Sequence, residues 1–231
     1  MRLPFAPVLA LVLLALPALA QEVPRTIVVS GLGEVSAVPD MAYVTLGAQA
    51  EAATAAEALA ATSAAVAASL EVLTGAGIDA RDIQTSGISL SPRMVWPENG
   101  NGAPRIEGYV ASNQLTVRVR DLEVLGGVLD AVVSSGANTL GGVSFALSEP
   151  RAAEDDARRA AVEDARARAA LYAEAAGVTL GPVREIAEEG FSQPMPRMMA
   201  AEAAMSDAAP PVAPGELTVS ARVRVVYSIA D

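Results

Sequence analysis

The chain ends in LTVSARVRVVY, residues 217–227, in which apolar and polar side chains alternate almost without a break. Successive side chains of a β-strand point to opposite faces, so this pattern predicts a strand with one buried face and one wet face. The same period of two occurs in residues 41–50 and near the end of residues 105–120. Strands of this kind form a sheet that has one face packed on a core and the other in solvent.

Further strands are predicted at residues 26–38, 83–96, 142–147 and 182–188. Pro39-Asp40 is a turn signal between the strands at 26–38 and 41–50, so we expect those two strands to be neighbours. Gly31-Leu32-Gly33 resembles part of a nucleotide-binding loop, but the third glycine and the following helix are missing from the sequence.

Three segments have the start and stop signals of helices. Thr54-Ala55-Ala56-Glu57 matches a capping box, and Gly75 and Gly77 end that helix, whose apolar stripe we place at Leu59, Val66, Leu70 and Leu73. The second helix follows a cap at Asp121 and ends at Gly136.

The third helix opens at Ser148-Glu149-Pro150 and ends at Gly177. Alanine recurs in it every four residues, at Ala153, Ala157, Ala161, Ala165, Ala169 and Ala173. The complete order is ββαββαβαββ, which predicts an α+β protein with a mixed or antiparallel sheet packed against about three helices. Residues 191–215 contain five prolines and lack periodicity, and we expect them to form an exposed, mobile insertion.

Residues 1–20 have the pattern of a secretory signal peptide. Arg2 precedes an apolar stretch at 8–16, and Ala18-Leu19-Ala20 is a cleavage site of the A-x-A kind. Cleavage near Ala20 leaves a mature chain, 21–231, that we expect in the periplasm or outside the cell; a retained N-terminal anchor is the alternative. We expect no transmembrane segment in the mature chain, because the uncharged stretch between Glu57 and Glu71 is shorter than the roughly 20 residues a span needs.

The 231-residue sequence contains no histidine, lysine or cysteine, and arginine supplies all 16 positive charges. The usual general base near neutral pH, the thiol nucleophile, the Schiff-base amine and the commonest zinc ligands are therefore absent. We predict that the protein is not an enzyme and has no cofactor. The net charge of −11 also makes nucleic acid a poor partner.

One enzyme hypothesis remains, because acidic side chains cluster at Glu154-Asp155-Asp156 and at Glu188-Glu189. A hydrolase that uses two carboxylates needs them to converge on a cleft with separated pKa values. Acids are also favoured at a helix N-terminus, so the first cluster is equally typical of solvated structural charge.

Methionines gather in the segment expected to be an insertion, at Met195, Met198, Met199 and Met205. Thioether sulfur is a soft ligand that suits Cu(I), and exposed methionines can also consume oxidants as reversible sulfoxides. A Cu(I) site or an oxidant-scavenging loop is thus one hypothesis. Incidental methionines, or a patch for a partner protein, are the alternatives.

Four stretches carry a family resemblance: IVVSGLGE (27–34) followed by Pro39-Asp40, GIDARDIQT (77–85), GYVASNQLTVRVRDL (108–122), and Pro214-Gly215-Glu216. Together they resemble the SIMPL domain family of bacterial periplasmic proteins, over nearly all of residues 21–231. The resemblance implies an α+β fold, export, homo-oligomers and an association with oxidative-stress tolerance. It implies no reaction and no catalytic residue.

The leading hypothesis is therefore a non-enzymatic exported protein that self-associates and helps to protect the cell envelope, with other envelope proteins as further partners. Association would bury the alanine stripe of the third helix or pair exposed strand edges.

Overall fold

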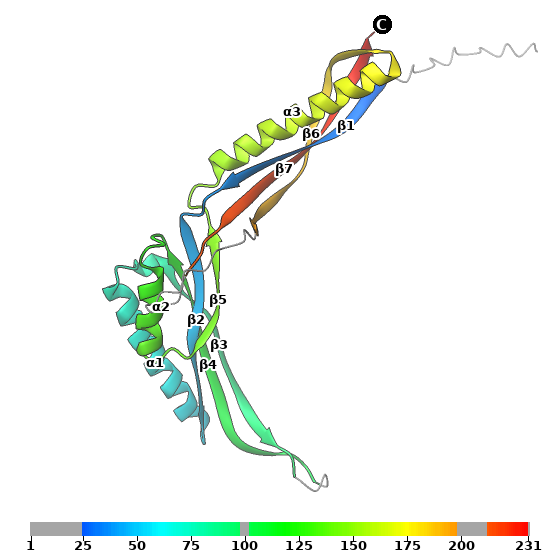
Figure 1. Cartoon of the computed structure of the whole chain (residues 1–231). Coiled ribbons are helices and arrows are strands. Elements are labelled where there is room, and N and C mark those ends of the chain that lie inside the picture. Colours follow the sequence, from blue (N-terminus) through cyan, green and yellow to red (C-terminus); the bar gives the residue numbers. More distant parts are fainter. Residues whose placement is uncertain (1–24, 98–101, 198–211, 231) are drawn as a thin grey trace, which may run out of the picture.

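The computed structural model describes residues 25–97, 102–197 and 212–230, and these form two lobes that lie end to end (Figure 1). The element order is the predicted ββαββαβαββ, with one short 3-10 helix added, and the α+β class is confirmed. The strands form two separate antiparallel sheets, whereas the sequence suggested one. The predicted signal peptide, residues 1–20, lies outside the described residues.

The lower lobe contains four strands and two helices. Its elements are β2 (Met41–Ala52), α1 (Ala55–Gly75), η1 (Ala80–Asp82), β3 (Ile83–Val95), β4 (Arg105–Val119), α2 (Leu125–Ser134) and β5 (Thr139–Ala146). The strands lie in the order β3-β4-β2-β5, so β3 and β5 are the two edges of this sheet. The apolar side chains of β2 and β4 pack against the two helices and form the core of the lobe.

The upper lobe contains three strands and one helix: β1 (Thr26–Ala37), α3 (Arg151–Ala176), β6 (Thr179–Arg197) and β7 (Glu216–Ala230). The strand order is β1-β7-β6. The core lies between β7 and α3, and it is built from the inward side chains of the alternating stretch 217–227. That alternation is confirmed, because every second residue from Leu217 to Tyr227 is buried.

Helix α3 lies unusually close to β1. A Cβ atom added to Gly31 would stand 2.0 Å from the carbonyl oxygen of Ala161, and one added to Gly33 would stand 2.0 Å from that of Ala157. The alanine stripe of α3 is buried against the sheet at Ala157, Ala161, Ala165, Ala169 and Ala173. Small residues on both elements thus let two backbones meet. The glycines at positions 31 and 33 are therefore explained by close packing against α3, and not by the binding of a nucleotide phosphate.

Several local predictions need correction. In α1 the buried residues are Ala58, Thr62, Val66, Ser69 and Leu73, while Leu59 and Leu70 are exposed. Small side chains face the sheet because they let the helix approach it closely. The capping box of Thr54 and Glu57 is confirmed, with both reciprocal hydrogen bonds present. Strand β6 continues to Arg197, beyond the predicted 182–188 and into the segment expected to be an insertion.

The expected pairing of the first two strands is also wrong. β1 pairs only with β7, and β2 pairs with β4 and β5. Residues 38–40 carry the chain from the upper lobe to the lower one, and 147–150 carry it back. Asp40 ties these two crossings together, because its carboxylate accepts hydrogen bonds from the backbone N–H and the hydroxyl of Ser148. Ser148 therefore serves this junction, and Pro150 stands at the N-cap of α3 with no side-chain hydrogen bond.

Among the described helices, α1 alone is long and apolar enough to cross a membrane by length and composition. Its buried stripe packs against the sheet of the lower lobe, next to β2 and β4. A core helix of this kind passes the same test as a membrane span.

Candidate functional site

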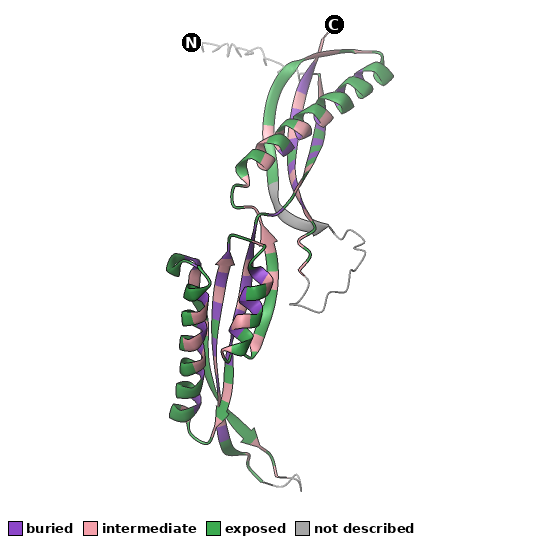
Figure 2. Ribbon diagram, turned by 60° about the vertical axis from the view of Figure 1, so that its left-hand side comes forward, coloured by how far each residue is buried: buried purple, intermediate pink, exposed green. Residues whose placement is uncertain are grey.

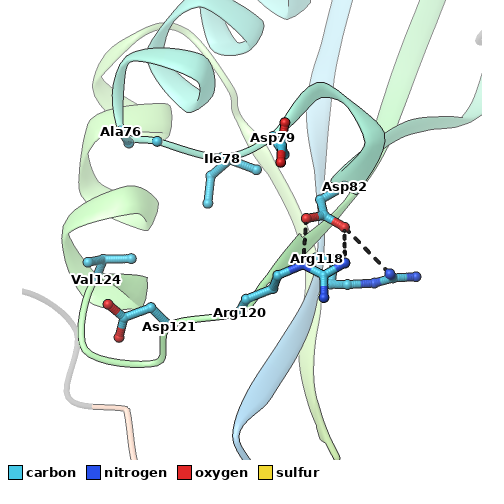
Figure 3. A pocket seen from close by; sticks show the side chains of 9 residues that line it. Ala76, Ile78, Asp79, Asp82, Arg118, Arg120, Asp121 and Val124 are labelled. Carbon is cyan, nitrogen blue, oxygen red and sulfur yellow. Dashed lines mark hydrogen bonds and ion pairs between the residues drawn. The ribbon is translucent and has the colours of Figure 1, made fainter. Parts of the chain in front are cut away.

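The most buried charged side chain of the described residues is Asp82, at the end of η1. Its side chain is only 4% exposed, and two arginines from the end of β4 hold it (Figure 3). Arg120 donates to both oxygens, with Nε 2.7 Å from Oδ2 and Nη2 2.9 Å from Oδ1. Nη1 of Arg118 lies 3.5 Å from Oδ1. One carboxylate thus binds two guanidinium groups.

Local structure explains why these side chains meet. Arg118 and Arg120 alternate with the buried Val117 and Val119, so they emerge from the face of β4 opposite the core. Asp82 immediately precedes β3, the strand that pairs with β4. The two stretches that carry the family resemblance at 77–85 and 108–122 are therefore joined by this ion-pair cluster.

The contacts within the cluster favour the charged form of each of its groups. The hydrogen bond from Arg120 is the main cause that lowers the pKa of Asp82, and Arg118 adds to it, while burial opposes them. The pKa of Arg120 is raised by the same contact. The carboxylate therefore remains ionised at neutral pH, and its lone pairs are occupied by arginine. A group in this state holds structure together and is unsuited to proton transfer.

A pocket of about 220 Å³ lies beside the cluster, between the end of α1 and the start of α2 (Figure 3). Asp79 and Asp121 share its lining with the two arginines, so charges of both signs surround it. Arg118 also lies over the ring of Tyr43, with its guanidinium carbon 5.3 Å from the ring centre. Its buried Nε has no hydrogen-bond partner among the described residues.

The two predicted acidic clusters meet in the upper lobe at Arg158. Its guanidinium lies 2.9 Å from Asp155, 3.2 Å from Glu188 and 3.8 Å from Glu154. Asp156 pairs instead with Arg159, and Glu189 accepts a hydrogen bond from Ser30. Of these carboxylates, Glu188 forms the ion pair that joins β6 to α3, whereas Glu154, Asp155 and Asp156 pair with arginines of α3 itself. Whether they support hydrolysis remains a prediction.

The methionine hypothesis falls largely outside the described residues. Met198, Met199 and Met205 lie there, and Met195 belongs to the described backbone of β6, opposite Thr218 of β7. The copper prediction stays a prediction. Within residues 25–97, 102–197 and 212–230 no group of three or more His, Cys, Asp or Glu side chains is placed to hold a metal ion.

The sequence did not reveal the surface formed by the outer strand of the lower lobe. β3 lies at the sheet edge, and its hairpin with β4 projects past the helices (Figures 1 and 2). Ile88 is 63% exposed and Leu90 is 43% exposed, and Met94 and Trp96 further along the segment are 48% and 69% exposed. No charged residue occurs between Ile83 and Pro92. That run without charge is the signal that could have identified this edge.

Comparison with known proteins gives a consistent picture. Residues 27–227 match the family model SIMPL, described as "Protein of unknown function (DUF541)". The 26 kDa periplasmic immunogenic protein of Brucella melitensis is 40% identical over 228 residues, which cover 93% of this chain and 91% of that protein. The uncharacterized protein YggE is 32% identical in Edwardsiella ictaluri, over 91% of this chain and 90% of that protein. YggE of Escherichia coli K12 is 30% identical, over 88% and 82% of the two chains.

Proposed function

This chain belongs to the SIMPL family, and we propose that it is an exported periplasmic protein that acts by associating with further copies of itself and does not turn over a substrate. The periplasmic part of the proposal follows the name of the Brucella relative and the signal-like residues 1–20. Protection of the envelope, including under oxidative stress, is the physiological role that we propose for the assembly.

The open edge at β3 is the observation that carries self-association. An edge strand offers unpaired backbone N–H and C=O groups, and soluble proteins usually protect such edges with charges or a covering element. From Ile83 to Pro92 β3 has no charge and no strand pairs with its outer side, and Ile88 and Leu90 add exposed apolar surface. A surface of this kind gains free energy when a partner covers it.

The alanine stripe of α3 is the other route that the sequence suggested, and the fold argues against it. The alanine stripe of α3 is already buried against β1 and β7 of its own chain. Assembly through that stripe would require α3 to leave its own lobe, so the strand edges are the route that we retain.

Native mass tests the proposal directly. We expect residues 21–231 at micromolar concentration to give a light-scattering mass above that of one chain, and Ile88→Arg combined with Leu90→Arg to lower it. Ile186→Arg is the matched control, because Ile186 is comparably exposed but lies on β6, a strand that already carries charges. A wild-type chain that remains a monomer would contradict self-association.

Trp96 supplies a second readout, because it is the one tryptophan of the sequence and lies at the end of β3. We expect its fluorescence emission to shift to the blue, and its quenching by acrylamide to fall, as the protein concentration rises. The protective role is tested separately, by peroxide survival of a deletion strain complemented with the wild type or with the double variant Ile88→Arg, Leu90→Arg. Equal rescue by both would separate protection from assembly.

The alternative function is Cu(I) binding or oxidant scavenging through Met195, Met198, Met199 and Met205. It is supported by the concentration of soft sulfur ligands in one short segment. The test compares Cu(I) titration and sulfoxide formation in the wild type and in a variant with these four residues changed to leucine. Leucine keeps the size and removes the sulfur. Equal Cu(I) binding by both proteins would end the copper hypothesis.

A further inference from the structure

We propose that the pocket beside Asp82 binds a small zwitterion of the α-amino acid type, with its carboxylate at Arg118 and its ammonium group at Asp121 (Figure 3). Such a site goes beyond the proposed self-association and does not depend on it. The pocket has a volume of about 220 Å³, whereas drug-sized ligands occupy pockets of roughly 300–1,000 Å³. Its size therefore suits a small molecule.

Most of the pocket is built from the two stretches that carry the family resemblance and meet at Asp82. Seven of the nine lining residues fall within 77–85 and 108–122. The ion pair of Asp82 with the two arginines accounts for only three of the seven. The other four line the same space without taking part in that ion pair: Gly77, Ile78, Asp79 and Asp121. The resemblance therefore extends beyond the ion pair to the pocket itself.

Arg118 is the cation that has capacity left for a ligand. Arg120 donates twice to Asp82, at 2.7 and 2.9 Å, whereas Nη1 of Arg118 lies 3.5 Å from that carboxylate. The Nε of Arg118 has no hydrogen-bond partner among the described residues, and 38% of the side chain is exposed. A guanidinium group binds carboxylates through paired N–H donors, and Asp82 uses those of Arg118 only in part. A ligand carboxylate can bind the exposed part of this group.

The charges of the pocket leave one cation and one anion without a match. The two arginines share the single negative charge of Asp82, which leaves one positive charge. Asp79 is neutralised by Arg81 at 3.0 Å. Asp121 remains as a negative charge that has no ion-pair partner among the described residues. A ligand with one charge of each sign satisfies both groups, whereas a simple anion or cation satisfies one and is repelled by the other.

Asp121 is held in place at the other end of the pocket. Its Oδ1 accepts a hydrogen bond from the backbone N–H of Glu123 at 2.9 Å, which orients the carboxylate and leaves Oδ2 for a ligand. Figure 3 shows Asp121 beside Val124, on the side of the pocket away from Arg118. Ile78 and Val124 add apolar surface to the lining. An amino acid that spans the pocket can thus reach both charges and place an apolar side chain on this surface.

Three matched molecules test the need for both charges. Alanine carries both groups, propionate lacks the ammonium group, and ethylamine lacks the carboxylate. Equilibrium dialysis of residues 21–231 against radiolabelled alanine measures binding, with propionate and ethylamine as unlabelled competitors. We expect alanine to bind roughly tenfold tighter than either competitor, or more, because each competitor lacks the hydrogen bonds of one charged group.

Arg118→Gln and Asp121→Asn test the two ends of the pocket. Asparagine at position 121 can still accept the hydrogen bond from Glu123, so the local backbone is preserved. We expect each change to weaken alanine binding roughly tenfold. Arg93→Gln on β3 and Asp130→Asn on α2 are the matched controls, because they remove the same charges outside the pocket and should leave binding unchanged. Far-ultraviolet circular dichroism checks that each variant is folded.

The outcomes are distinct. Absence of alanine binding at millimolar concentration, or binding that neither pocket variant weakens, would overturn the site. Propionate that binds as tightly as alanine would indicate a simple anion site and overturn the zwitterion. Light scattering on the same samples separates the two proposals, because a monomeric wild type that binds alanine contradicts only the self-association.

Discussion

The edges of the two sheets differ in how they are protected. In the upper lobe α3 lies over β1, and Asp164 of that helix accepts a hydrogen bond from the backbone N–H of Leu32 at 2.9 Å. The other edge, β6, carries Arg184, Glu185 and Glu188. In the lower lobe β3 has no charge from Ile83 to Pro92, and β5 has none over Thr139–Ala146.

This difference has a physical meaning. A sheet edge that is covered or charged resists addition of a further strand, whereas an edge without cover or charge can pair with one. The upper lobe therefore has a sheet whose edges are protected against further strands, and the lower lobe has a sheet that can be extended at its edges. We call the upper lobe the closed lobe for this reason. We expect association to be confined to the lower lobe.

The largest expected effect comes from Gly31→Ala, which opens the closed lobe. The new Cβ would stand 2.0 Å from a backbone carbonyl of α3, so the helix must move away from β1. We expect a loss of about 3 kcal/mol in the free energy of unfolding, measured with urea. The control is Gly127→Ala in α2, where an added Cβ meets no atom within 4 Å and alanine should stabilise the helix slightly. Equal stability of the two variants would show that β1 and α3 are not in such close contact.

A smaller loss is expected from Asp82→Asn in the lower lobe. The change keeps the shape of the side chain and removes the charge that Arg118 and Arg120 share. Both arginines are partly exposed and can be hydrated, so we expect a cost of about 2 kcal/mol and not the full penalty of a buried unpaired charge. Asp79→Asn is the control, because its ion pair with Arg81 is exposed and should matter little. Assembly should survive both changes, since Ile88 and Leu90 are untouched.

The contrast between the lobes could be foreseen only in part. Period-two alternation, the capping box at Thr54 and the glycine stops depend on local sequence, so the element order and the α+β class were predictable. The division into two sheets was not, because pairing depends on contacts between distant residues. Thr26 pairs with Ser228, about as far apart as the described chain allows. Pro39-Asp40 predicted a turn between two neighbouring strands, yet it marks the crossing between the lobes.

For the candidate sites, too, local features could be predicted from the sequence and contacts between distant residues could not. Arg118 and Arg120 could be assigned to the wet face of a strand, but their partner Asp82 lies more than thirty residues away in sequence. The alanine stripe of α3 could be recognised from the sequence. Its contact with Gly31 and Gly33 could not, because the need for glycine at these positions depends on α3 packing against β1.

Acid should weaken both lobes through three aspartates. Hydrogen bonds lower the pKa of Asp40 through Ser148, of Asp82 through Arg120 and of Asp164 through the N–H of Leu32. A carboxyl whose folded pKa lies below its unfolded value binds fewer protons when folded, so it stabilises at neutral pH. That stabilisation is lost as the pH falls below the ordinary value of 3.8 and through the lowered folded pKa.

Urea unfolding between pH 7 and pH 2 measures this loss. We expect the free energy of unfolding to fall below about pH 4, and to fall less steeply in Asp82→Asn, which lacks one of the three groups. A variant with the same acid limb as the wild type would show that Asp82 does not contribute to it.

The smallest expected effect is Asp164→Ala, which removes the cap on the closed edge but leaves α3 in place. The N–H of Leu32 then loses its acceptor, at a cost of about 1 kcal/mol, and its hydrogen exchange should accelerate by a factor of roughly 5 to 10. Asp156→Ala is the matched control on the same helix, because Asp156 forms an ion pair with the exposed Arg159 of its own helix and not with β1. If α3 alone keeps β1 closed, the native mass will not change. A rise in mass with Asp164→Ala, and none with Asp156→Ala, would show instead that this single carboxylate is what prevents the upper sheet from being extended.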